Sequence, residues 1–159
     1  MNLYSSTFLA YAILNYGIDC AHIAQIFWGG YLMESNLINV NPQMQKLAEN
    51  AVTTARDKFG VSLDFTENSL QQLEMLLQQA HEGYKQTSST GNISVENTVQ
   101  VWGSYLGEVI RRSLGGNWIV DQKDVFLQLN SKRLDPLGQV RSRIMMGTQY
   151  GLKESKRLL

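Results

Sequence analysis

Residues 94–114 carry the strongest folding signal in the chain, a stripe of large apolar side chains at helical spacing. The stripe consists of Val95, Val99, Trp102, Leu106 and Val109. Steps of four and three residues return each side chain to one face of an α-helix. A helix with a continuous apolar face must bury that face. We therefore expect the other elements to pack around this stripe.

Two pairs of glycines belong to the same segment. Gly103 and Gly107 lie one turn apart inside it, whereas Gly115 and Gly116 follow its end, where glycine is a typical stop signal. A glycine inside a helix costs about 1 kcal/mol relative to alanine, so the inner pair needs a compensating reason. The reason is either close approach of another helix or strand, which is the commoner cause, or a ligand lying on bare backbone.

Proline signals mark the start of two further helices. Asn-Pro at 41–42 and Asp-Pro at 135–136 each place an N-cap residue before a proline at the first helical position, and Gly60 and Gly147 end the two segments. A leucine stripe predicts a third helix over about 66–83. The last twelve residues fit either a basic tail or one more short helix.

The spacing of the apolar residues changes after Gly115-Gly116, and the new pattern predicts a small sheet. β-Forming residues occupy 118–120, 125–129 and 132–134, separated by short turns. The fold class is therefore α+β, mainly helical with about five helices and a small antiparallel sheet of two or three strands near residues 117–134. We divide the chain into an apolar N-terminal helical segment, residues 1–40, and a single α+β domain, residues 41–159.

The N-terminal segment is unusually apolar and has no basic residue before position 46. We expect a helix over roughly 6–28. Its polar stripe consists of Asn15, Asp19, His22 and Gln25. Its apolar residues, which we propose as an interface for a protein partner or for self-association as a dimer, are Ile13, Tyr16, Ile23, Phe27 and Trp28. The same pattern fits a helix packed into its own core. A membrane span is disfavoured, because a centred Asp costs about 2.5–3.5 kcal/mol on insertion.

Charge is unevenly distributed along the chain although the formal net charge is zero. Residues 91–159 hold ten basic and six acidic side chains, which gives that third a net charge of +4. This third is either a solvated face or a contact surface for an acidic partner. Zero overall charge and no known motif argue against nucleic-acid binding. One cysteine and two histidines argue against a Cys/His zinc site, and we expect neither metal nor cofactor.

Candidate binding residues cluster around Glu108. Arg111 and Arg112 follow it at the spacing of intrahelical ion pairs, which is one interpretation. The other is a pocket beside Gly115-Gly116 that holds a carboxylate or phosphate. The residues we assign to that binding site are Tyr105, Glu108, Arg111, Arg112, Trp118 and Arg143. No phosphate loop, HExxH or nucleophile elbow is present in the sequence, so we assign no catalytic residue.

Two segments resemble a family of small uncharacterised bacterial proteins, known as a domain of unknown function. WGSYLGEVIRR at 102–112 with GGNW at 115–118 resembles the family's GxYLGEVIRR…GGxW helix-to-strand unit. DPLGQVRSRIMMG at 135–147 resembles its DPxGxVxxRIxxG helix. The resemblance covers about residues 61–147 and implies a bacterial, cytoplasmic protein, but it implies no activity.

Two function classes remain open. The first is a non-enzymatic protein-interaction module, of immunity or adaptor type, that uses residues 1–34 and the basic C-terminal third. The second is a small-molecule-binding protein or small enzyme with its pocket beside Gly115-Gly116.

Overall fold

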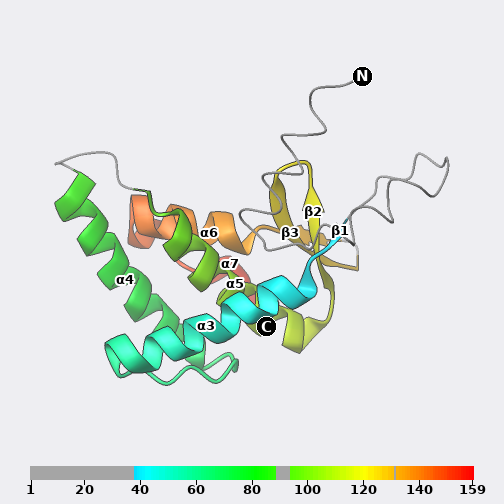
Figure 1. The fold of residues 1–159 in the computed structure, drawn as a ribbon, viewed down its shortest axis with the longest axis horizontal. Coiled ribbons are helices and arrows are strands. Elements are labelled where there is room, and N and C mark those ends of the chain that lie inside the picture. The colour runs from blue at the N-terminus through cyan, green and yellow to red at the C-terminus, as the bar shows by residue number, and fades with distance from the viewer. Residues whose placement is uncertain (1–37, 89–93, 131) are drawn as a thin grey trace.

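Helix α5 (Glu96–Leu114) is the element around which the rest of the fold is built (Figure 1). The computed structural model describes residues 38–88, 94–130 and 132–159. In order, these form β1 (Ile38–Asn39), α3 (Asn41–Phe59), α4 (Ser69–Ser88), α5, β2 (Asn117–Asp121), β3 (Asp124–Leu129), β4 (Lys132–Leu134), α6 (Pro136–Met146), the 3-10 helix η1 (Thr148–Tyr150) and α7 (Lys153–Leu158). α3 and α6 pack on α5, and α4 packs mainly on α6. The sheet and α4 lie at opposite ends of the molecule.

The predicted fold class is confirmed: the described residues form a mainly helical α+β fold with one small antiparallel sheet. The predicted apolar stripe is the centre of the core, since Trp102 is 5% exposed and Leu106 and Val109 are fully buried. The last residues form the short helix α7, which was one of the two expectations for them.

The sheet has four strands in the order β1-β2-β3-β4, each antiparallel to its neighbour. Its inner face carries Trp118, Val120, Val125, Leu127 and Leu134, all of which belong to the core. Strand β1 was not predicted, because a strand of two residues is too short to show an alternation of apolar and polar side chains. Its two residues belong to the N-terminal segment, residues 1–40, that the sequence analysis separated from the domain. Val40, the last residue of that segment, is fully buried in the core.

The start of α3 differs from the expectation. Asn41 does not cap its own helix; its side chain accepts a hydrogen bond from the backbone N–H of Trp118 at 2.6 Å and donates one to Asn117 at 2.9 Å. The backbone N–H of Asn41 is satisfied instead by the Asn39 side chain at 2.9 Å. Asn41 therefore ties the start of α3 to β2. The end of α3 is as predicted, with Gly60 left-handed at φ +67°.

Helix α4 is displaced along the sequence from its prediction. It begins at Ser69, three residues after the expected start, and continues past Gly83 to Ser88. A methyl group added to Gly83 would meet nothing within 4 Å, so this glycine is tolerated on an open face of the helix. At the other predicted start, Asp135 caps α6 by accepting the N–H of Gly138 at 2.7 Å.

Close packing explains both inner glycines of α5. A Cβ on Gly103 would lie 2.9 Å from the Cα of Leu137, so α6 approaches the α5 backbone there. A Cβ on Gly107 would lie 2.0 Å from the indole of Trp118, which reaches α5 from β2. Of the two reasons considered for these glycines, helix and strand packing is therefore the one that the structure shows.

We expect Gly107→Ala to destabilise the protein by about 2 kcal/mol, because the indole of Trp118 must move from its place in the core. Gly83→Ala is the matched control and should stabilise it by up to about 1 kcal/mol, since the added methyl group is unopposed and favours the helix. Urea denaturation of both variants measures the two effects. Equal stabilities would contradict the packing explanation.

Candidate functional site

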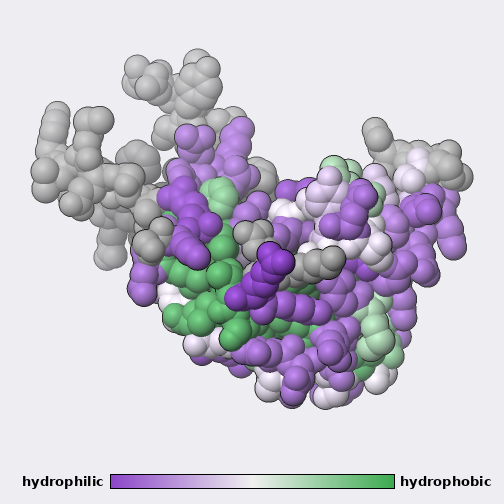
Figure 2. Space-filling model, turned by 180° about the vertical axis from the view of Figure 1, so that it is seen from behind, coloured by the Kyte–Doolittle hydropathy of each residue, from purple (hydrophilic) through white to green (hydrophobic). Residues whose placement is uncertain are grey.

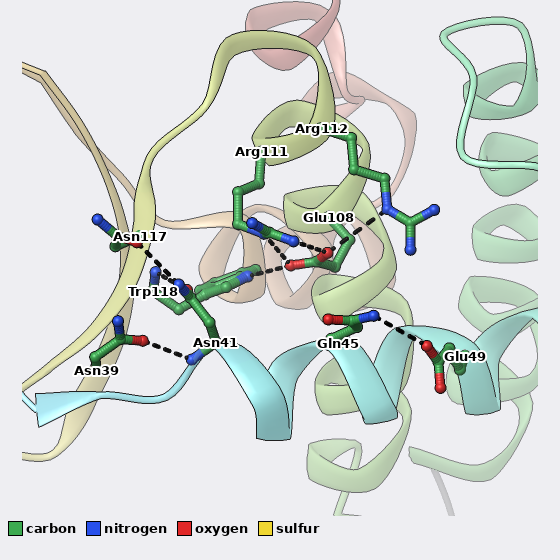
Figure 3. Close-up of polar contacts among 9 residues, drawn as sticks. All are labelled: Asn39, Asn41, Gln45, Glu49, Glu108, Arg111, Arg112, Asn117 and Trp118. Carbon is green, nitrogen blue, oxygen red and sulfur yellow. Dashed lines mark hydrogen bonds and ion pairs between the residues drawn. The ribbon is translucent and has the colours of Figure 1, made fainter.

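Glu108 lies fully buried on α5, and among the described residues its carboxylate contacts three members of the predicted site. Arg111 donates two hydrogen bonds to it, from Nε at 2.7 Å and from Nη2 at 2.9 Å. Trp118 donates its indole N–H at 2.9 Å, and Nε of Arg112 lies 3.7 Å from the second oxygen. Figure 3 shows the two guanidinium groups and the indole converging on this carboxylate from different sides.

The network neutralises a charge that would otherwise be costly to bury. The two arginine side chains extend from Glu108 to the surface, where they are 25% and 39% exposed. The hydrogen bonds that Arg111 donates to the Glu108 carboxylate raise the pKa of Arg111 above its ordinary value. Both carboxylate oxygens already have partners, so the group is positioned to hold Trp118 and the end of α5 in place.

Tyr105 is fully buried one turn before Glu108 and connects α5 to the loop that precedes α4. Its hydroxyl accepts the backbone N–H of Phe65 at 2.9 Å and lies 2.6 Å from Oγ of Ser69. The guanidinium of Arg112 lies 3.6 Å from the centre of the Phe65 ring. Burial raises the pKa of Tyr105, because the phenolate would be poorly solvated there. The contacts of Tyr105 are thus those of a core residue.

Arg143 joins a different group, at the contact between α6 and α4. It is 2% exposed and donates to Glu74 at 3.1 Å and to Gln78 at 2.8 Å. One turn farther along α4, His81 is bonded through Nδ1 to the carbonyl of Ile144 at 2.7 Å, at the end of α6. Nη1 of Arg143 has no hydrogen-bond partner among the described residues. Of the six predicted binding residues, five therefore converge around α5 and β2, and Arg143 belongs to the α4–α6 contact.

The predicted interface residues Ile13, Tyr16, Ile23, Phe27 and Trp28 lie outside the described residues.

A polar hollow of about 690 Å³ lies between β4, α6 and η1, and we call it the C-terminal hollow. Arg133, Asp135, Ser142, Tyr150 and Arg157 are among the residues that line it. The sequence analysis assigned none of them to a binding site, because they come from four separate segments of the chain. The only sequence signal for this surface is the net positive charge of the C-terminal third.

A second hollow of about 440 Å³ lies between α3, α4 and the first half of α5, and it is more apolar. Its lining includes Lys58, Phe59, Leu76, Val101 and Trp102. Phe59 is 44% exposed and meets the Trp102 ring edge-on at a centroid distance of 6.3 Å.

Seen from behind, most of the surface is hydrophilic, and hydrophobic surface gathers at the end that holds the sheet and the last turns of α5 (Figure 2). The residues that line the two hollows do not include Tyr105, Glu108, Arg111, Arg112 or Trp118.

Among residues 38–88, 94–130 and 132–159, no three His, Cys, Asp or Glu side chains are arranged to hold a metal ion. Within the same residues, no helix has the length and hydropathy needed to cross a membrane.

Comparison with known proteins adds information on the fold alone. No family model matches the chain. No curated protein matches it either. A crystal structure of a protein from Bacteroides thetaiotaomicron VPI-5482 superposes with a TM-score of 0.52 at 16% sequence identity. The match covers 77% of this chain and 46% of that protein, so this chain spans less than half of its length.

Glu108→Gln should lower the free energy of unfolding by about 2 kcal/mol, because it leaves Arg111 and Arg112 without their counter-charge. The cost stays below that of a fully buried pair, since both guanidinium groups reach solvent. Glu96→Gln on the same helix is the control. It removes a pair with Arg141 that is 43% exposed on each side and should cost no more than about 1 kcal/mol. Urea denaturation compares the two, and equal losses would argue against a structural role for Glu108.

Tyr105→Phe should cost about 1 kcal/mol at neutral pH, because the hydrogen bonds of the hydroxyl to Phe65 and Ser69 are lost. The pKa of Tyr105 is raised in the folded state, so unfolding favours its ionisation at high pH. The contribution of this group to stability is complete below pH 10 and is lost as pH rises above that value. Thermal denaturation between neutral pH and about pH 11 should therefore show a shallower decline for the variant than for the wild type. Tyr150→Phe, at an exposed position, is the control.

Proposed function

We propose that this protein is a non-enzymatic protein-interaction module, of immunity or adaptor type, that acts in a bacterial cytoplasm. Its partner is a protein with an acidic surface, which it binds through the C-terminal hollow. The observation that carries the proposal is the open rim of this hollow. Tyr150 is 47% exposed there, and Arg157 is exposed and has no ion-pair partner among the described residues.

The charge of the rim favours an acidic partner. Arg133 and Arg157 contribute two positive charges to the lining, and Asp135 contributes one negative charge. Asp135 already accepts a hydrogen bond from Gly138 as the cap of α6, and Arg133 pairs with Asp121 at 2.6 Å. Of the two arginines in the lining, Arg157 is thus the one without an ion-pair partner among the described residues. Arginine and tyrosine are the residue types that most often dominate binding energy at protein interfaces.

The engagement of Glu108 supports a binding function over an enzymatic one. Its carboxylate is buried and held by Arg111, Arg112 and Trp118. The charged cluster that the sequence analysis assigned to a binding site therefore stabilises the fold. The alternative of a small-molecule pocket beside Gly115-Gly116 needed these groups to face a ligand.

Arg157→Glu should weaken binding of a Glu-rich peptide by about tenfold, because one attractive contact becomes repulsive. Titration calorimetry at low and moderate ionic strength measures the affinity, which should fall as salt is added. Arg56→Glu is the matched control, since Arg56 is an exposed arginine on α3 whose partner is the neighbouring Asp57. It should leave the affinity within about twofold.

Free glutamate and inorganic phosphate are titrated alongside the peptide. Binding of either as tightly as the peptide would favour the small-molecule alternative. No binding of the peptide, or equal losses in the two variants, would overturn the proposed function.

A further inference from the structure

The hollow between α3, α4 and α5, which we call the helical hollow, takes no part in the proposed function. Its volume is about 440 Å³. Sites for small molecules usually measure roughly 300–1,000 Å³, so the helical hollow has the size of such a site. α3 packs on α5 and α4 packs mainly on α6, so the two outer helices leave this part of α5 uncovered between them.

The floor of the helical hollow is apolar and well fixed. The rings of Phe59 and Trp102 meet with their centroids 6.3 Å apart at an interplanar angle of 64°, and Leu76 lines the same space. Trp102 and Leu76 belong to the core and are 5% and 3% exposed, whereas Phe59 is 44% exposed. An apolar ligand that covers Phe59 therefore removes hydrophobic surface from water, which favours binding.

Lys58 supplies the charge of the helical hollow. Its side chain is exposed and has no ion-pair partner among the described residues. Its neighbours Arg56 and Asp57 are bonded to each other at 2.9 Å. None of the described residues that line the hollow is acidic, and its other polar lining residues are Thr54, Gln79, Asn97 and Thr98. A single cation thus lies beside an apolar floor.

We propose that the helical hollow binds a small organic carboxylate with an apolar body, the class to which medium-chain fatty acids belong. The apolar body lies on Phe59 and Trp102, and the carboxylate pairs with the ammonium group of Lys58. Thr54 lies one turn before Lys58 on the same face of α3, so its hydroxyl is placed to donate to the same carboxylate.

The composition of the lining selects this class of ligand. A hydrophilic anion would leave the aromatic floor in water, and an uncharged apolar molecule would leave Lys58 without a counter-charge. A protein partner would have to extend well beyond the hollow, because stable interfaces bury about 800 Å² on each side. The inference is independent of the proposed acidic partner, since the C-terminal hollow shares no lining residue with this one.

Titration calorimetry of the full-length protein with octanoate tests the proposal. We expect binding at one site, and Lys58→Gln should weaken it about fivefold, the upper range for an exposed ion pair. Lys46→Gln is the matched control, because Lys46 is an exposed lysine of the same helix outside the lining, and it should leave the affinity unchanged.

1-Octanol has the same chain without the charge and isolates the contribution of the carboxylate. It should bind the wild type about fivefold more weakly than octanoate does. In the Lys58→Gln protein the two ligands should bind with similar affinity, because the carboxylate has lost its counter-charge there. Butyrate keeps the charge but lacks four methylene groups, so it should bind at least about a hundredfold more weakly than octanoate.

Two substitutions on α4 locate the ligand. Ala80→Phe fills the helical hollow and should weaken octanoate binding at least about tenfold, whereas Met75→Phe, at an exposed position outside the lining, should not. Circular dichroism checks that each variant is folded. If Ala80→Phe does not fold, Gln79→Phe places the same ring at an exposed position of the lining. Arg157→Glu, in the C-terminal hollow, should leave octanoate binding intact.

Four results would overturn the proposal. Octanoate could fail to bind, or 1-octanol could bind the wild type as tightly as octanoate does. Lys58→Gln could bind octanoate as tightly as Lys46→Gln does. Octanoate binding could also be lost in Arg157→Glu and kept in a folded Ala80→Phe variant, which would place the ligand in the C-terminal hollow. The titration with the Glu-rich peptide is a separate measurement, so failure of this inference is distinguishable from failure of the proposed function.

Discussion

The contact of Trp118 with the α5 backbone is the interaction on which the rest of the structure depends. The indole can lie on the helix only because position 107 is glycine, and its N–H is satisfied by the buried carboxylate of Glu108. Asn41 holds the backbone of the same strand to the start of α3. One residue of β2 thus joins the sheet to the central helix and to the first long helix, and these three elements supply about half of the core residues.

The Glu108 cluster shows how one sequence pattern serves two different purposes. A glutamate followed by arginines at the third and fourth positions is expected both of a surface ion pair and of an anion-binding pocket. Burial decides between them. Glu108 is fully buried, accepts hydrogen bonds from Arg111 and Trp118 and forms an ion pair with Arg112, so its charge stabilises a packed junction. The arginines keep their outer edges in solvent, which limits the desolvation cost of the pair.

The side chains that remain available to bind a partner lie at the surface of the protein. The C-terminal hollow combines an arginine that has no ion-pair partner among the described residues with an exposed tyrosine. The likeness to the Bacteroides thetaiotaomicron protein extends to the fold, and this chain covers 46% of that protein.

The sequence by itself determined the central helix, the stops and prolines that bound α3 and α6, and the small sheet, because these depend on spacing between neighbours along the chain. It also singled out Gly107, Glu108 and Trp118, although not the contact among them. Only the tertiary structure decided that Arg143 meets α4, that residues 38–39 form a strand, and which residues line the hollows. Such contacts join groups far apart in sequence, and no local period encodes which distant partner will fill a given space.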